Sequence, residues 1–409
     1  MTPEYYILIT GYIFGFYMAW NIGANDVANS MASAVGAKAI TIRQAVFIAG
    51  ILNVVGAVFI GSHVTQTIRK GIVSTDILSD PHVALIGALS ALLAAALWVS
   101  FATWKSLPVS TTHSIVGSMI GFGIMAGGFS VINWGKLAAV VMSWIISPVF
   151  SLAIAFFMFK TIVKLIMIKK DAFARALRLS PVFIGMAAFV VVLSFLFKTP
   201  LGKTLAIDAW TALLVALVLG GVIGYAGKAV LKRFVHSGEG GDGTEEVFRK
   251  IQIGTSCYVA LAQGANDVAN AIGPLAVIYF LVTTGNVGTK VPVPIWLLLF
   301  GGIGIAAGIG MAGHRVMETI GTKITTLTNT RGFSVDFAAA STVLMASKMG
   351  LPVSTTHAAV GGVLGVGLAG GIEAVNFRIV LKIMLYWVLT VPASAITSMT
   401  IFIILQLFV

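Results

Sequence analysis

The stretch GANDVAN at residues 23–29 occurs a second time in the chain, at residues 264–270. A second stretch, LPVSTTH at residues 107–113, recurs in the same order at residues 351–357. Two seven-residue identities with nearly equal offsets are typical of an internal duplication. The chain therefore contains two copies of one unit, and the fold has to accommodate both.

The sequence around these motifs is too apolar for a water-soluble protein. Of its 409 residues, 58% are apolar and only 10% are charged, whereas a soluble domain is about one-quarter charged. A net charge of +12 would ordinarily suggest nucleic-acid binding, but here Lys and Arg punctuate long apolar runs instead of clustering on a polar face. We therefore predict an all-α integral membrane protein that has the lipid bilayer, and no nucleic acid, as its partner.

The apolar runs predict about twelve transmembrane segments, because about 20 such residues cross a bilayer once. They lie near residues 5–35, 43–62, 83–104, 108–128, 134–159, 181–198, 205–230, 251–283, 294–313, 333–349, 352–371 and 378–408. The first and the eighth are too long for one straight helix, and each carries a copy of GANDVAN. We therefore expect a break in each of these two helices at the motif, within two inverted repeats that contain broken or hairpin half-helices.

The order of the segments predicts three parts: a first repeat at 1–160, a linker with a two-segment hairpin and a loop at 161–250, and a second repeat at 251–409. If all twelve segments cross, seven crossings separate equivalent points, and the two repeats are inverted relative to each other. If 108–128 and 352–371 are instead re-entrant, six crossings intervene and the repeats are parallel.

The basic residues predict the orientation of the chain in the membrane. With twelve crossings, most of the 26 Lys and Arg residues fall on one side. Because cytoplasmic loops are enriched in these residues, both termini are predicted outside the cell (inner) membrane. The loops at 160–178 and 231–250 are predicted to be cytoplasmic.

GANDVAN places three polar side chains on roughly one face of a helix, since Asn29 lies four residues after Asn25 and three after Asp26. A carboxylate, amide oxygens and backbone carbonyls freed by a loosened helix are hard oxygen ligands suited to a cation such as Na⁺. The alternative is that the Asn side chains only hydrogen-bond helices together. The second copy supplies Asn266, Asp267 and Asn270.

LPVSTTH resembles the start of a helix, because proline and hydroxyl residues favour the first turn. Free N–H groups and three hydroxyls at the positive end of a helix dipole would form an anion site without a full positive charge. The hydroxyls in question are those of Ser110, Thr111 and Thr112, and of Ser354, Thr355 and Thr356. The alternative is that they bond back to their own helix.

Three further residues are candidates for the same site. His113 and His357 end the two copies of LPVSTTH, and each could bond an oxyanion, relay a proton or satisfy a neighbouring carbonyl. Asp336 lies in an apolar stretch of the second repeat. A carboxylate at membrane depth is costly and is commonly functional.

The four motifs together resemble the signatures of the inorganic phosphate transporter (PiT) family, over essentially the whole chain. The resemblance implies a phosphate site between the two repeats, with Ser110, Thr111, Thr112, Ser354, Thr355 and Thr356 contacting the anion; we add Asn25 and Asn266 to this set. It also implies that Asp26 and Asp267 bind the coupling cations, assisted by Asn29 and Asn270. Asn53 departs from the pattern, since some relatives carry an acid there.

The resulting hypothesis is a sodium-coupled phosphate symporter that works by alternating access, with sodium as a co-transported ion, no other cofactor and no enzymatic activity. Coupling to protons, or transport of a metal–phosphate complex, is the alternative within this class. An anion channel is a different class, and an intramembrane hydrolase using Ser110 or Ser354 with its histidine is a third. The oligomeric state stays open, with a homodimer among the options.

Overall fold

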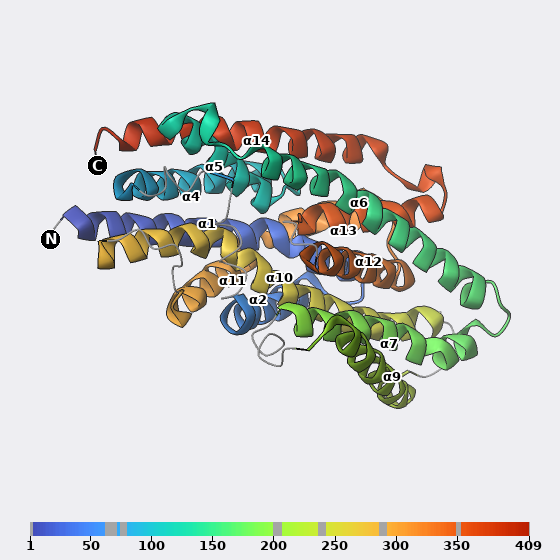
Figure 1. Cartoon of the computed structure of the whole chain (residues 1–409). Helices are drawn as coiled ribbons and strands as arrows, with labels where there is room; N and C mark the ends of the chain where they lie inside the picture. The colour runs from blue at the N-terminus through green and yellow to red at the C-terminus, as the bar shows by residue number, and fades with distance from the viewer. Residues whose placement is uncertain are drawn as a thin grey trace.

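A computed structural model describes residues 3–61, 72–73, 80–198, 207–235, 243–285, 293–348 and 353–408. Within these residues the chain forms twelve α-helices and no strand (Figure 1). Their bounds are α1 Pro3–Gly36, α2 Ile42–Ile60, α4 Pro81–Trp104, α5 Thr111–Gly127, α6 Trp134–Ile162, α7 Ala172–Lys198, α9 Ala209–Phe234, α10 Gly243–Thr284, α11 Ile295–Glu318, α12 Asn329–Lys348, α13 Thr355–Ala369 and α14 Phe377–Leu405.

The twelve helices coincide with the twelve predicted segments, because long apolar runs between cap residues leave the chain little alternative. Asp80, for example, caps α4 through the N–H of His82, and Pro81 occupies the first turn. Nine helical segments of the described chain are long and apolar enough to cross a membrane. The segments outside that group are α5, α12 and α13, which carry polar motif residues or are short.

The two motif helices are continuous, so the prediction of broken helices at residues 23–29 and 264–270 is wrong. Both stretches are helical throughout, inside α1 and α10. Asn25, Asn29 and Asn270 find partners on other segments of the chain and need no freed backbone in their own helices. Gly23 serves a different purpose: a Cβ there would stand 1.9 Å from the carbonyl oxygen of Ile305, so glycine allows α1 to approach α11 closely.

The repeats are inverted relative to each other. Gly11 of α1 lies against Ile278 of α10, and Gly15 lies against Leu275, so the two equivalent helices run antiparallel. The parallel-repeat alternative is therefore wrong. That alternative counted the segment before 108–128 as a full crossing. Instead, α4 and α5 together form an antiparallel hairpin, with Gly87 packed on Phe122. The hairpin returns the chain to the same level whether or not its tip crosses the bilayer.

The second helix of each hairpin packs on the other repeat. Gly117 and Gly121 of α5 lie against the backbone of α14, while Gly361 and Gly365 of α13 lie against the backbone of α6. Small residues let helix backbones approach closely inside a membrane. These exchanged contacts hold the two repeats together around the centre of the molecule (Figure 1).

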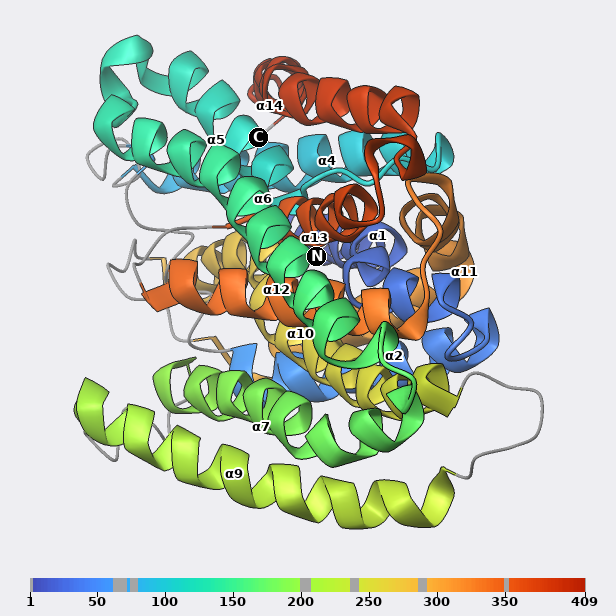
Figure 2. The same cartoon turned by 90° about the vertical axis from the view of Figure 1, so that its right-hand side faces the viewer.

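The linker hairpin of α7 and α9 packs at one side of this assembly, where α7 contacts α10 and α12 (Figure 2). Both ends of the chain lie at the same end of the molecule in Figure 1. That arrangement agrees with an even number of crossings. The assignment of that end to the outside, and the boundaries 1–160, 161–250 and 251–409, stay predictions.

Candidate functional site

The two LPVSTTH motifs begin helices, as their sequence indicates. Ser110 is the N-cap of α5 and accepts a hydrogen bond from the N–H of His113. Ser354 caps α13 in the same way through the N–H of His357. The first-turn N–H groups of a helix have no partner within that helix. Leu351 and Pro352 of the second motif lie outside the described residues.

The motif helices reach across to the hairpin of the opposite repeat. Asn29 of α1 donates from Nδ2 to the hydroxyls of Thr355 and Thr356, at 3.2 and 3.0 Å. Asn270 of α10 donates to the hydroxyls of Thr111 and Thr112, at 3.2 and 3.3 Å. Both copies of GANDVAN and both copies of LPVSTTH therefore meet at one place, although they are far apart in the sequence.

Asp26 lies between the starts of both hairpin helices. Its carboxylate accepts a hydrogen bond from Thr111 of the first repeat at 2.6 Å and one from Thr356 of the second repeat at 3.4 Å. Asn29 donates to the same group at 3.4 Å. Only 1% of Asp26 is exposed, and the four ion pairs found in the described chain do not include it.

Asp267 is equally buried, and its carboxylate interacts electrostatically with that of Asp26. Asn266 donates to it from Nδ2 at 2.9 Å. Two like charges in a low-dielectric interior repel strongly. This pair therefore favours the binding of a cation or a proton between or beside the carboxylates.

Asn25 holds the tip of the first hairpin. Its amide nitrogen donates to the Thr103 hydroxyl and the Leu107 carbonyl, at 2.9 and 3.1 Å, and its oxygen accepts from the N–H of Val109 at 3.0 Å. The side chain is fully buried. Phosphate contacts by Asn25 and Asn266 stay a prediction, and the observed bonds give Asn25 a positioning role.

The two histidines form the centre of an aromatic stack directly behind the helix starts. The centroid of the His113 ring lies 3.6 Å from the ring centroid of Trp144 and 4.4 Å from that of His357. His357 stacks in turn on Trp387 at 3.7 Å, and its Nδ1 lies 3.0 Å from the carbonyl oxygen of Trp144. Of the roles open to a histidine here, His357 fills that of satisfying a neighbouring carbonyl.

Asp336 belongs to a separate polar cluster. Its carboxylate accepts hydrogen bonds from Ser33 of α1 at 2.5 Å and from Ser256 and Thr255 of α10 at 2.5 and 3.2 Å. Ser33 lies about two turns of α1 beyond Asp26. The structure therefore brings Asp336 near the same two helices, but not into the group that contains Asp26.

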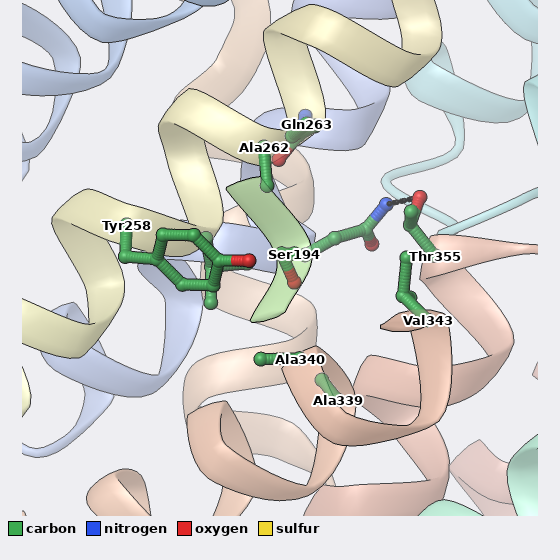
Figure 3. Close-up of a pocket in the computed structure, with 10 residues that line it drawn as sticks. Ser194, Tyr258, Ala262, Gln263, Ala339, Ala340, Val343 and Thr355 are labelled. Atoms are coloured by element: carbon green, nitrogen blue, oxygen red, sulfur yellow. Dashed lines mark hydrogen bonds between the residues drawn. The ribbon is translucent and has the colours of Figure 1, made fainter. Parts of the chain in front are cut away.

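A small cavity adjoins the central group on one side. It has a volume of about 30 Å³ and is lined by Asn29, Ser194, Tyr258, Gln263 and Thr355, among others, which is room for a water molecule or a small cation. In Figure 3 the Tyr258 hydroxyl points toward Ser194, and Thr355 is at the far wall. Ser194 comes from α7, so the linker hairpin contributes to the site.

Sequence reasoning missed Gln263. It is 2% exposed, and neither its Oε1 nor its Nε2 has a hydrogen-bond partner among the described residues. A buried amide in that condition is costly unless something binds to it. A signal was present: Gln263 directly precedes the second GANDVAN, where the first copy is preceded by Ile22.

The site thus combines two helix starts, which attract an anion, with two buried carboxylates, which attract cations. Such an arrangement can bind an anion and a cation at neighbouring positions. Among the described residues no cluster of three or more His, Cys, Asp or Glu side chains could hold a metal ion. The side chains that meet around Asp26 are a carboxylate, an amide and two hydroxyls.

Comparison with known proteins gives a consistent result. A model of the phosphate transporter family matches residues 22–398. A protein of Thermococcus kodakarensis named as a phosphate permease is 51% identical over 402 residues, which covers 98% of each chain. Inorganic phosphate transporter 2-1 from the chloroplast of Arabidopsis thaliana is 40% identical over 407 residues, which covers 94% of this chain and 69% of that protein.

A solved structure described as the sodium-dependent phosphate transporter superposes with a TM-score of 0.89 and 46% identity. The match covers 98% of this chain and 100% of the other. Sequence motifs, fold and family model agree along nearly the whole length. This chain is a helical membrane protein that belongs to the phosphate transporter family.

Proposed function

We propose that the chain is a sodium-coupled symporter of inorganic phosphate, working by alternating access in the cell (inner) membrane with both termini outside. One observation carries the proposal: the Asp26 carboxylate lies between the first turns of α5 and α13, which come from opposite repeats. Phosphate would bind between the repeats, near the bilayer midplane. Inverted-repeat transporters commonly place their substrate there.

The anion would be held by the hydroxyls and N–H groups at residues 110–112 and 354–356. Helix starts bind phosphate through partial charges, which allows the ion to be released again. Asp26 and Asp267, with Asn29 and Asn270, would bind the cations. Cations at these carboxylates offset both their mutual repulsion and their repulsion of phosphate.

Sodium is favoured over protons by two considerations. The group around Asp26 contains carboxylate and hydroxyl oxygens, and the amide oxygen of neighbouring Asn29 has no hydrogen-bond partner among the described residues. Such oxygens are ligands that hard cations prefer. The similar solved structure is also described as sodium-dependent. An anion channel fits less well, because buried carboxylates repel a permeating anion unless a cation accompanies it.

Phosphate uptake into proteoliposomes tests the proposal, with sodium and proton gradients imposed separately. We expect an inward sodium gradient to drive accumulation of labelled phosphate above equilibrium, and a proton gradient alone to drive none. Accumulation driven by a proton gradient alone would show that protons, and not sodium, are the coupling ions. Loss of uptake on adding a metal chelator would indicate a metal–phosphate substrate. Equal uptake without any gradient would identify a channel.

A further inference from the structure

An apolar groove runs between α6 and α7 on the surface of the molecule. It has a volume of about 440 Å³; Ala153, Phe157 and Leu165 line its α6 side, and Leu179 and Val182 its α7 side. Phe157 is 67% exposed and Val182 54% exposed. The groove's hydroxyl group, that of Thr161, donates to its own helix at the carbonyl of Phe157. The groove therefore suits a hydrocarbon.

The shape of the groove follows from the packing of the two helices. Helix α6 packs on α12 and α13, whereas α7 packs on α9 and α10, so the helices diverge from their connection (Figure 2). That connection includes a π-helical turn, Val163–Met167. From Ala153 to Leu165 the groove extends about 18 Å along the helix axis, close to one leaflet of a hydrocarbon core about 30 Å thick.

Six basic residues lie in this connection and in the adjoining turns of α6 and α7. They are Lys160, Lys164, Lys169, Lys170, Arg175 and Arg178, and all are exposed. Asp171 is the only acidic residue of this stretch, and it pairs with Arg175 at 2.6 Å. The hydrogen bond from Arg175 lowers the pKa of Asp171, so this acid stays ionised and offsets one cation only. Lys164 and Arg178 directly adjoin the groove residues Leu165 and Leu179.

We propose that this groove binds an anionic phospholipid, with an acyl chain between α6 and α7 and the phosphate-bearing headgroup on the basic connection. The juxtaposition of an apolar groove one leaflet long with a cationic cluster at its end matches both parts of such a lipid. The basic connection is predicted to be cytoplasmic, where anionic lipids make the membrane surface negative.

A second copy of the chain fits the groove less well. A two-fold dimer places the same surface of each subunit against its partner. Two clusters of six basic residues would then lie close together, which is repulsive at the short range of an interface. Free inorganic phosphate would use the basic residues but not the groove. An anionic lipid uses both.

Native mass spectrometry of the full chain in a non-ionic detergent tests the proposal, with phosphatidylglycerol and phosphatidylcholine as the two probes. We expect selective retention of phosphatidylglycerol, unaffected by added inorganic phosphate. Because a Lys or Arg near an anionic surface contributes about fivefold in affinity, Lys164→Gln combined with Arg178→Gln should weaken retention about 25-fold. Filling the groove with Ala153→Phe should reduce retention of both lipids.

A matched control is Lys232→Gln combined with Arg233→Gln, an exposed basic pair at the end of α9. It removes the same charge from another connection and should leave retention unchanged, and thermal unfolding of each variant checks that it is folded. Unchanged retention in the Lys164/Arg178 variant or in folded Ala153→Phe overturns the proposal, as does displacement of the lipid by inorganic phosphate. If Ala153→Phe instead separates a dimer without altering lipid retention, the groove is an interface between copies.

Discussion

The two copies of GANDVAN have the same sequence but different surroundings. In α1, Asn25 bonds to Thr103 and to the backbone of the hairpin tip, and one turn earlier Asn21 accepts a hydrogen bond from Ser100 at 2.7 Å. Over these residues α1 is therefore hydrogen-bonded to α4 and to the segment that follows it. The Asn25 side of the first GANDVAN copy is therefore occupied by α4 and the hairpin tip.

The equivalent face of α10 borders the cavity. Asn266 is half-buried and donates to its neighbour Asp267, and Ala262 stands where α1 has Asn21. Tyr258 and Gln263 line the cavity against α7 and α12. Among the residues that the structure describes, the two copies of one sequence therefore make unequal contacts.

The largest effect is expected from Asp26→Asn and Asp267→Asn. The surroundings of the two carboxylates differ, but the proposed cation site needs the negative charge of both. In the proposed site each carboxylate forms a buried ion pair with bound sodium. Removing one partner of such a pair costs about 3–5 kcal/mol, which corresponds to a loss of roughly 100-fold or more in sodium-driven uptake. Proteoliposome uptake measures this. Asp171→Asn, at an exposed carboxylate, is the control and should transport normally. Normal transport by either of the first two variants removes that carboxylate from the cation site.

A medium effect is expected from Asn25→Ala, and here the copies should differ. The change leaves the Val109 N–H and the Leu107 carbonyl without their buried partner. Since each unsatisfied group costs about 1–3 kcal/mol, the free energy of unfolding should fall by about 3 kcal/mol, measured by detergent titration in mixed micelles. Asn266→Ala should cost about 1 kcal/mol or less. Equal losses in the free energy of unfolding would show that Asn266 stabilises its surroundings as much as Asn25 does.

The smallest effect is expected from Gln263→Ile, which copies the first-repeat residue into the second. Removing a buried amide without a described partner should leave stability unchanged or raise it by about 1 kcal/mol. Uptake at subsaturating phosphate should fall by up to about tenfold. Gln252→Leu is the control, because Gln252 is fully buried without a described partner but does not line the cavity. Equal transport by both variants would mean that the cavity has no part in transport.

Much of the fold could be predicted because the deciding information is local. The lengths of the apolar runs predict the helices, and the nearly equal offsets between the repeated motifs predict the duplication. A common site for GANDVAN and LPVSTTH was implied by the resemblance to the phosphate transporter family. The interrupted helices were predicted wrongly because the partners of Asn25 and Asn29 come from residues about 80 and 330 positions away, and no local pattern shows that these bonds form.

The unpredicted parts of the site depend on tertiary packing. Thr103 and Ser194 are ordinary polar residues in apolar helices until α4 and α7 place them beside the motifs. Asp336 was singled out by its apolar neighbours, but its partners Ser33 and Ser256 were not. A position-by-position comparison of the two copies is the sequence-level signal that would have found Gln263.

The exchanged hydrogen bonds of Asn29 and Asn270 have an evolutionary consequence. Each joins a motif helix to the hairpin of the opposite repeat. Before the gene duplicated and fused, these bonds would have run between two separate five-helix subunits inserted in opposite orientations. The centre of the present chain would then descend from an interface between two subunits, and fusion would have freed its two halves to diverge.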